Sequence, residues 1–269
     1  VIEELVRELL KQPDVLLQFL PQLSVGQQRM AYVFGRAVAL FANDALQFEE
    51  PIKSAFGAAS AEQRNFALLA GYYSGLSERH PDAVEAFKRE AVVSSVFAPA
   101  LPAVCGSIGI TGADVRLVCE GLSAKSVPPF SVSHWAYGAV LSKLAAGVVA
   151  PLFDLMLGMD ERAYSVALDL IGMYVHGQPQ RLEELRPQLK LAVRNVGLRP
   201  NRRGSQMDAH HFKEMIGWLL AKGWDDPDAR SVALTLAKHI AEKPDSDAVE
   251  MVQPLLPTML SKFAPIVWP

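Results

Sequence analysis

The chain has 269 residues, enough for one large domain or two small ones; 50% of them are hydrophobic and 20% charged. A chain this apolar can bury a sizeable core, which excludes intrinsic disorder. With 26 Lys and Arg against 29 Asp and Glu, the net charge of −3 excludes a wholly basic surface that binds nucleic acid or anionic membranes by charge alone. Two cysteines, Cys105 and Cys119, are too few for a disulfide framework.

The first residues do not read as a targeting signal. The chain starts at Val1 on an apolar and acidic helical pattern, without the basic region and apolar core of a signal peptide. The longest nearly apolar stretch, 144–153, has ten residues and is interrupted by Pro151, whereas a transmembrane helix needs about 20. We therefore expect a cytoplasmic protein with no membrane partner. Because the chain stops in an apolar segment at Pro269, we also expect a piece of a longer protein.

Helical periodicity dominates from the first residues onward. Apolar residues recur at spacings of three and four within 6–10, 16–20 and 30–34, whereas alternating runs of β-branched residues do not occur. Proline and glycine fall between the periodic segments. The pattern predicts an all-α protein with about twelve to fourteen helices of roughly 10–18 residues. Longer connections are expected at 123–131 and 197–205.

Two segments in the second half of the chain are alike. Residues 160–170 and 226–236 align without a gap, with seven of eleven positions identical, and start 66 residues apart. Segments starting at Ser24 and Ser60, and a weaker one at Ser131, share with them a helix-capping residue seven positions before a small residue. We expect these Ser and Asp side chains to accept hydrogen bonds from first-turn amides.

The offset predicts two-helix repeats of about 33–40 residues that must stack to bury their apolar faces. A stack of such repeats has two layers of helices, and two similar helices that start 66 residues apart could still lie in different layers.

One of these segments resembles a known repeat. Residues 225–233 resemble the first helix of a HEAT repeat, which begins with an acidic and proline turn and carries an arginine followed three residues later by an alanine, here Arg230 and Ala233. The segment at 160 has Tyr164 in place of the arginine. The resemblance implies a right-handed α-solenoid of stacked antiparallel helix pairs, HEAT-like or ARM-like. We expect one such domain over residues 1–269, with an irregularity at 197–207.

The most informative local feature is the basic segment, residues 181–203. Six of its basic residues are binding candidates: Arg186, Lys190, Arg194, Arg199, Arg202 and Arg203. The first three are spaced four apart and share one helix face, and the others lie in the following loop. Guanidinium groups massed in this way suit phosphate or carboxylate ligands. The alternative is a solvated face neutralised by the acidic pairs at 160–161 or 225–226, which is the more common outcome for a charge run.

The segment around 208–214 could place two metal ligands, a histidine and Glu214, on one helix face. A third ligand would have to come from elsewhere, so we interpret Asp208 as a helix N-cap and His210 and His211 as residues of solvated first turns.

The remaining chemistry-bearing residues are interpreted as structural. We expect His134, Trp135 and His176 to pack and hydrogen-bond between helices, and the two cysteines to be small buried hydrophobes. Four aromatic residues are expected in the core between repeats rather than in a groove for a partner helix: Tyr72, Tyr73, Trp218 and Trp224. No serine-nucleophile or phosphate-loop motif occurs. The sequence therefore predicts no catalytic residue, cofactor or metal, and does not favour an enzyme.

Solenoids present extended surfaces that mainly hold other macromolecules. The first hypothesis is therefore a non-enzymatic protein-interaction, scaffold or sensor module that binds a protein partner or another domain of its parent chain. In general character it is similar to C-terminal regions of large prokaryotic multidomain proteins, including NTPase-linked defence proteins. The alternative is a nucleic-acid-binding module, similar to HEAT-like DNA glycosylases, that uses the basic segment 181–203. A small-ligand or nucleotide sensor using the same arginines is a third hypothesis.

Overall fold

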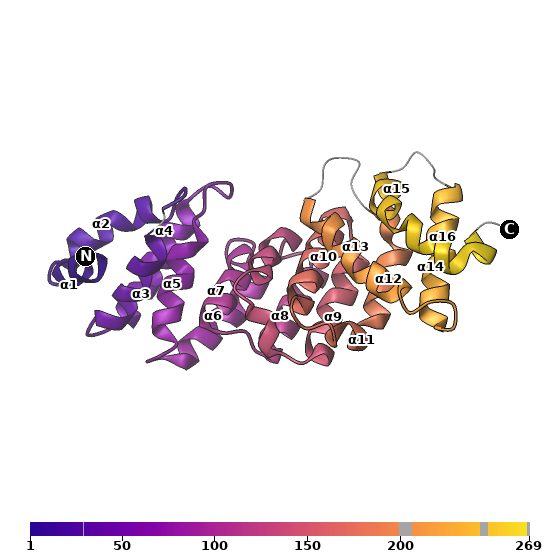
Figure 1. The fold of residues 1–269 in the computed structure, drawn as a ribbon. Coiled ribbons are helices and arrows are strands. Elements are labelled where there is room, and N and C mark those ends of the chain that lie inside the picture. The colour runs from indigo at the N-terminus through magenta and orange to yellow at the C-terminus, as the bar shows by residue number, and fades with distance from the viewer. Residues whose placement is uncertain (29, 199–205, 243–246, 268–269) are drawn as a thin grey trace. The chain divides into compact units, whose positions relative to one another are not determined.

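The computed structural model describes residues 1–28, 30–198, 206–242 and 247–267, and it is all-α (Figure 1). Over these ranges every regular element is a helix, and the only extended pairing is an isolated antiparallel bridge between Val25 and Arg64. No helix in the described ranges is both long and apolar enough to cross a membrane. The all-α prediction is thus confirmed. The chain divides into two compact units, residues 1–134 and 135–269, here called unit 1 and unit 2.

Unit 1 consists of eight α-helices with two short 3₁₀ turns among them. The helices are α1 (Ile2–Leu9), α2 (Pro13–Leu23), α3 (Ala31–Phe41), α4 (Glu49–Ala58), α5 (Phe66–Leu76), α6 (Pro81–Val93), α7 (Leu101–Ile108) and α8 (Gly112–Ser123), with η1 (Leu46–Phe48) and η2 (Ala98–Ala100). Alternate helices pack on one another: α1, α3, α5 and α7 form one row, while α2 packs on α4 and α6 on α8. A 3₁₀ segment, η3 (Pro129–Ala136), includes the last residues of this unit.

Unit 2 also places alternate helices in rows. Its elements are η4 (Val140–Lys143), α9 (Ala146–Leu157), α10 (Glu161–Val175), α11 (Arg181–Glu184), α12 (Arg186–Arg194), η5 (Val196–Leu198), α13 (Gln206–Leu220), α14 (Pro227–Glu242), α15 (Asp247–Val252), η6 (Gln253–Leu255) and α16 (Leu256–Val267). One row runs α9, α12, α14 and α16, and the other runs α10, α13 and α15. The two similar segments, in α10 and α14, therefore lie in different rows, so their 66-residue offset is not a repeat period.

The helices outnumber the predicted twelve to fourteen, because several segments that read as one helix are divided. The described residues form sixteen α-helices, and five of them are shorter than ten residues: α1, α7, α11, α12 and α15. Prolines mark several of these divisions, since the first turn of a helix is where a proline fits best, although α2 and α9 each contain one further along, Pro21 and Pro151. Pro13, for example, starts α2 directly after α1. The predicted irregularity at 197–207 falls mostly outside the described residues.

The cap prediction is confirmed for one pair of segments and wrong for the other. Asp160 accepts a hydrogen bond from the Ala163 amide at 2.9 Å, and Asp226 accepts from the Asp228 and Ala229 amides at 3.0 Å. Ser24, however, ends α2, and Ser60 lies in the turn after α4. The helix that Ser60 was expected to start begins six residues later at Phe66, where Asn65 supplies the cap. Ser131 lies inside η3 rather than at a helix start.

Four of the nine residues interpreted as structural are fully buried, as expected. Tyr72 donates a hydrogen bond to the Ala45 carbonyl, and the buried Tyr73 ring stacks on Phe87 at a centroid distance of 3.9 Å. Trp135 and Cys105 are also fully covered, and burial raises the pKa of both cysteine thiols, to about 11 for the half-buried Cys119. Raised pKa values leave these thiols protonated and unreactive at neutral pH.

Candidate functional site

Helix α12 carries the first three residues of the basic segment, and two of them are paired with acids. The Arg186 guanidinium donates to Asp226 at 2.7 Å and to Glu183 at 2.6 Å, and the Lys190 ammonium donates to Asp228 at 2.7 Å. Asp226 and Asp228 start α14, so the pairs join neighbouring helices of one row. The pairs are surface interactions of modest energy, but they offset the positive charge of α12.

The titration of these groups follows from the pairing. Hydrogen bonds from Arg186 and Lys222 hold the pKa of Glu183 below its usual range. Burial opposes ionisation of Asp226, but the Ala229 amide and the Arg186 guanidinium outweigh it and lower its pKa. Both acids are therefore ionised at neutral pH. Arg194 ends α12, is exposed and forms no ion pair with another described residue, while Arg199, Arg202 and Arg203 lie outside the described residues.

A second feature of unit 2 was not predicted: the packed faces of α10 and α13 each carry polar residues, which are here called the polar stripes. Along α10 and its C-terminal cap, the small or polar residues are Ser165, Asp169, Gly172 and His176. Along α13, the corresponding stripe is Asp208, His211, Met215 and Trp218. Spacings of three and four place each set on a single helix face. The two helices pack directly on one another, so the stripes face each other.

At the centre of this interface the His211 imidazole lies against the backbone of α10. A Cβ atom added to Gly172 would overlap the His211 ring, so only glycine allows this approach. His211 is 8% exposed, yet no hydrogen bond joins either ring nitrogen to another described residue. Neither ring nitrogen is fully enclosed by protein, and the residue lines a cavity, so the imidazole can offer a hydrogen bond to a molecule in that cavity.

The deeper end of the interface holds two carboxyl groups. Ser165 donates to Asp208 at 2.7 Å, and the fully buried Asp208 also accepts from the Ala209 amide. One carboxylate oxygen of Asp169 is buried without a hydrogen-bond partner. Burial, together with the nearby Asp208 carboxylate, raises the pKa of Asp169 to about 6. The negative charge of Asp208 thus disfavours ionisation of Asp169.

The other end of the interface opens into a cavity of about 380 Å³, here called the α10–α13 cavity. Its polar lining consists of three of the six histidines and one acid: His176, His210, His211 and Glu214. Leu182, Met215 and Trp218 contribute apolar wall. A mostly apolar cavity of this size with a few converging polar groups has the features of a small-ligand site.

The ionisation of His211 is set by this environment. Burial lowers its pKa, and the neighbouring His210 and His176 rings lower it further against the opposing effect of Asp208. His211 is thus neutral at neutral pH and can either donate or accept a hydrogen bond.

Trp218 connects the cavity with the basic segment. The Lys222 ammonium lies 4.3 Å from the centre of the Trp218 ring, and the Arg186 guanidinium lies 5.8 Å from it. Both cations also bind Glu183, so their charges are compensated where they cover the indole. The structure therefore brings Arg186 next to the cavity, while Arg194 lies elsewhere on α12.

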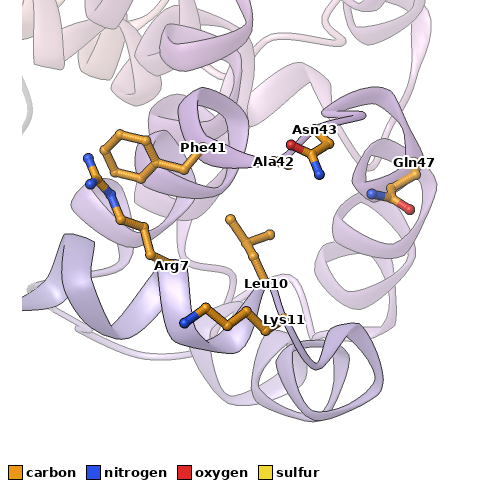
Figure 2. Close-up of a pocket in the computed structure, with 7 residues that line it drawn as sticks. All are labelled: Arg7, Leu10, Lys11, Phe41, Ala42, Asn43 and Gln47. Carbon is orange, nitrogen blue, oxygen red and sulfur yellow. The ribbon is translucent and has the colours of Figure 1, made fainter.

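Unit 1 contains a different kind of cavity, of about 290 Å³, beside the C-terminal end of α1 (Figure 2). Figure 2 shows Arg7 lying along Phe41, and the guanidinium carbon is 4.0 Å from the centre of that ring. Lys11 is paired with Glu8 at 2.7 Å. Asn43 and Gln47 are exposed, so their amides are satisfied by solvent. No side chain of this lining is both buried and without a partner, which makes it a weaker candidate than the α10–α13 cavity.

Several interpretations from sequence change at this site. Asp208 is not an N-cap, because α13 begins at Gln206 and Ser165 on α10 binds the carboxylate instead. His211 is buried rather than solvated, whereas His134 and His176 are exposed rather than packed between helices. Trp224 is also partly exposed and lies beside Arg230. Among the described residues, no three His, Cys, Asp or Glu side chains are placed to hold a metal ion.

The sequence did contain a signal for the polar stripes. Within otherwise apolar α10, Ser165, Asp169, Gly172 and His176 recur at helical spacing, which predicts a polar face. Each of these residues has a structural explanation when it is considered alone. Their shared position beside the cavity becomes apparent only when α13 is packed on α10.

Comparisons of the chain with family models, with curated proteins and with solved structures find no match.

Proposed function

We propose that the chain is a non-enzymatic protein-interaction module built as a HEAT-like, right-handed α-solenoid over residues 1–269. The observation that supports it is the spacing of side-chain hydrogen bonds between helices. In unit 1, Arg36 bonds Glu78 and Lys53 bonds Glu90; in unit 2, Gln188 bonds Asp154, Lys190 bonds Asp228 and Ser165 bonds Asp208. These partners are 34 to 43 residues apart.

Such spacing is typical of stacked two-helix repeats, in which each unit contacts mainly its neighbours. Each repeat then adds one more strip of exposed helix surface, and the sum is an extended face suited to another protein rather than a closed active site. In this proposal the chain is an interaction, scaffold or sensor region within a larger cytoplasmic protein, and its partner is a separate protein or another domain of that parent chain.

The pairing of Arg186 and Lys190 with α14 favours a protein partner over nucleic acid. A phosphate backbone would have to displace Asp226 and Asp228 to reach these cations. Nucleic-acid binding also depends steeply on salt, in proportion to the number of phosphates neutralised.

The experiment is affinity enrichment of partners on the purified chain, followed by titration of each purified candidate in parallel with a short duplex and a single strand. We expect saturable binding of one protein and no salt-dependent binding of either nucleic acid. Tight nucleic-acid binding with a steep salt slope, lost when Arg194, Arg199, Arg202 and Arg203 are replaced by alanine, would overturn the proposal.

A further inference from the structure

The α10–α13 cavity has a polar group that the protein itself does not use. His211 is more than nine-tenths buried, lines the cavity and has no hydrogen-bond partner among the described residues. Gly172 is the residue that permits this placement, because any side chain there would overlap the imidazole. Because the imidazole lines the cavity and bonds no other described residue, a ring nitrogen is available to a bound hydrogen-bond donor.

The charge of the cavity lining favours a cationic ligand over an anionic one. Among the described residues, Glu214 is the one acid in the lining and no Lys or Arg lines the cavity, while burial keeps His211 neutral. Behind the imidazole, Asp208 and Asp169 add negative potential at the α10–α13 interface. The nearest cations, Lys222 and Arg186, are bound to Glu183. A cation would meet a carboxylate and imidazole lone pairs here, whereas an anion would be repelled by the Glu214 carboxylate.

The apolar residues of the cavity lining suit a ligand with an aliphatic stem. Leu182 and Met215 are 6% and 2% exposed and, with Trp218, offer apolar surface to an aliphatic stem. A group with several N–H donors at the end of such a stem would satisfy the imidazole and the carboxylate together, as charge-assisted hydrogen bonds do.

We propose that the α10–α13 cavity binds an organic cation, a guanidinium or alkylammonium group on an apolar stem, with its N–H groups donating to Glu214 and His211 and its stem lying against Leu182, Met215 and Trp218. The same chemistry occurs in free alkylamines and alkylguanidines and in the arginine and lysine side chains of peptides. The site does not depend on the interaction function proposed above.

The test is a titration of the full chain with n-butylguanidinium, followed through the histidine ring resonances by NMR. His176, His210 and His211 should shift with one saturable constant, while His80 in unit 1 should not. n-Butylurea has the same stem and a planar N–H head without the charge, and we expect it to bind at least about tenfold more weakly. Equal binding of the urea, stronger binding of n-butylsulfonate, or no shift at His211 would overturn the proposal.

Two variants assign the binding to the cavity. Glu214→Gln removes the charged acceptor from an exposed position and should weaken butylguanidinium binding about tenfold. Glu161→Gln, at an exposed position at the start of α10, is the matched control and should bind like the parent chain. Equal affinity of the Glu214→Gln variant and the parent chain would contradict the assignment.

Binding should also weaken as the pH falls below the usual range for histidine. Protonation of His211, His210 and His176 would place positive charge around the ligand, while protonation of Glu214, Asp208 and Asp169 would remove negative charge. Affinity that rises on acidification would identify an anion site instead and overturn the proposal.

The source of the cation is decided with two further probes. N-acetylarginine methylamide carries the guanidinium on a peptide unit, and agmatine carries it on a free alkylamine. Tighter binding of the first would assign the cavity to a peptide side chain, and tighter binding of the second to a free amine; either result supports the proposed chemistry, and failure of both would overturn it.

Discussion

The α3–α5 interface of unit 1 and the α10–α13 interface of unit 2 use glycine for different purposes. In the first, Gly35 and Gly71 bring backbone against backbone: a Cβ at Gly71 would overlap the Tyr32 carbonyl oxygen, and one at Gly35 would overlap that of Leu68. In the second, Gly172 makes room for a polar side chain, His211. The same residue type thus serves close packing in one interface and a polar cavity in the other.

The difference shows where stability and binding reside. Backbone contact between α3 and α5 leaves no space for a ligand and fixes the two helices firmly. The α10–α13 interface contains a buried carboxylate oxygen without a hydrogen-bond partner and a cavity, each of which lowers stability. Residues that destabilise the folded chain without an internal partner are candidates for contact with something outside it.

The largest effect is expected at the tightest contact. Gly71→Ala should lower the free energy of unfolding by about 3 kcal/mol or more, because the added methyl meets backbone that cannot rotate away. Gly147→Ala, in the first turn of α9 with open space around it, should be neutral or slightly stabilising. Denaturant titrations of the two variants measure the contrast, and equal free energies of unfolding would contradict it.

A smaller loss is expected at Gly172. Here the added methyl meets the ring and the Cβ of His211, side-chain atoms rather than backbone, so we expect a loss of about 1–2 kcal/mol in the free energy of unfolding. His211→Ala removes the ring but keeps the Cβ, so in that background the same substitution should cost less. A double-mutant cycle measures this coupling, and independent, additive effects would show that His211 is not the obstacle.

Asp169→Asn should raise the free energy of unfolding at neutral pH rather than lower it. The folded-state pKa of Asp169, about 6, lies above the usual value of 3.8. The folded chain therefore binds this proton more tightly, and stability falls as the pH rises between about 4 and 6. Above that window the amide variant should be more stable than the parent chain by about 1 kcal/mol, and the advantage should disappear in acid. Thermal unfolding of both proteins across pH checks the trend; a pH-independent difference would refute the assigned cause.

The smallest change in stability is expected at Glu214. Because this side chain is exposed and forms no ion pair among the described residues, Glu214→Gln should change the free energy of unfolding by less than about 0.5 kcal/mol. A larger loss would mean that the Glu214 carboxylate stabilises the fold. Weaker ligand binding by the Glu214→Gln variant would then have to be compared with binding by the Glu161→Gln control.

Sequence patterns were sufficient for the helical class and for the caps at Asp160 and Asp226, because both depend on local spacing and local hydrogen bonds. They failed at Ser24 and Ser60, where the chain continues through turns before the next helix begins. The sequence did not show which row α10 and α14 belong to, since similar local sequences can occur in either row. The cavity was out of reach because its residues acquire their roles only when α13 packs on α10.

The basic segment shows the same limit of local patterns. A spacing of four places Arg186 and Lys190 on one helix face, as α12 confirms. Their acidic partners, Asp228 and Asp226, lie 38 and 40 residues further along at the start of α14, and the sequence offered only Asp226 of the two, as part of one alternative acidic pair.

The most direct test of this contrast between the two interfaces is amide hydrogen exchange of the whole chain with and without n-butylguanidinium. We predict that amides of α3 and α5 exchange slowly and equally in both conditions, whereas those of α10 and α13 exchange faster in the free chain and become protected when the ligand is added. Equal protection of both helix pairs in the free chain, or no change in α10 and α13 at saturating ligand, would contradict the division between a packing interface and a binding interface.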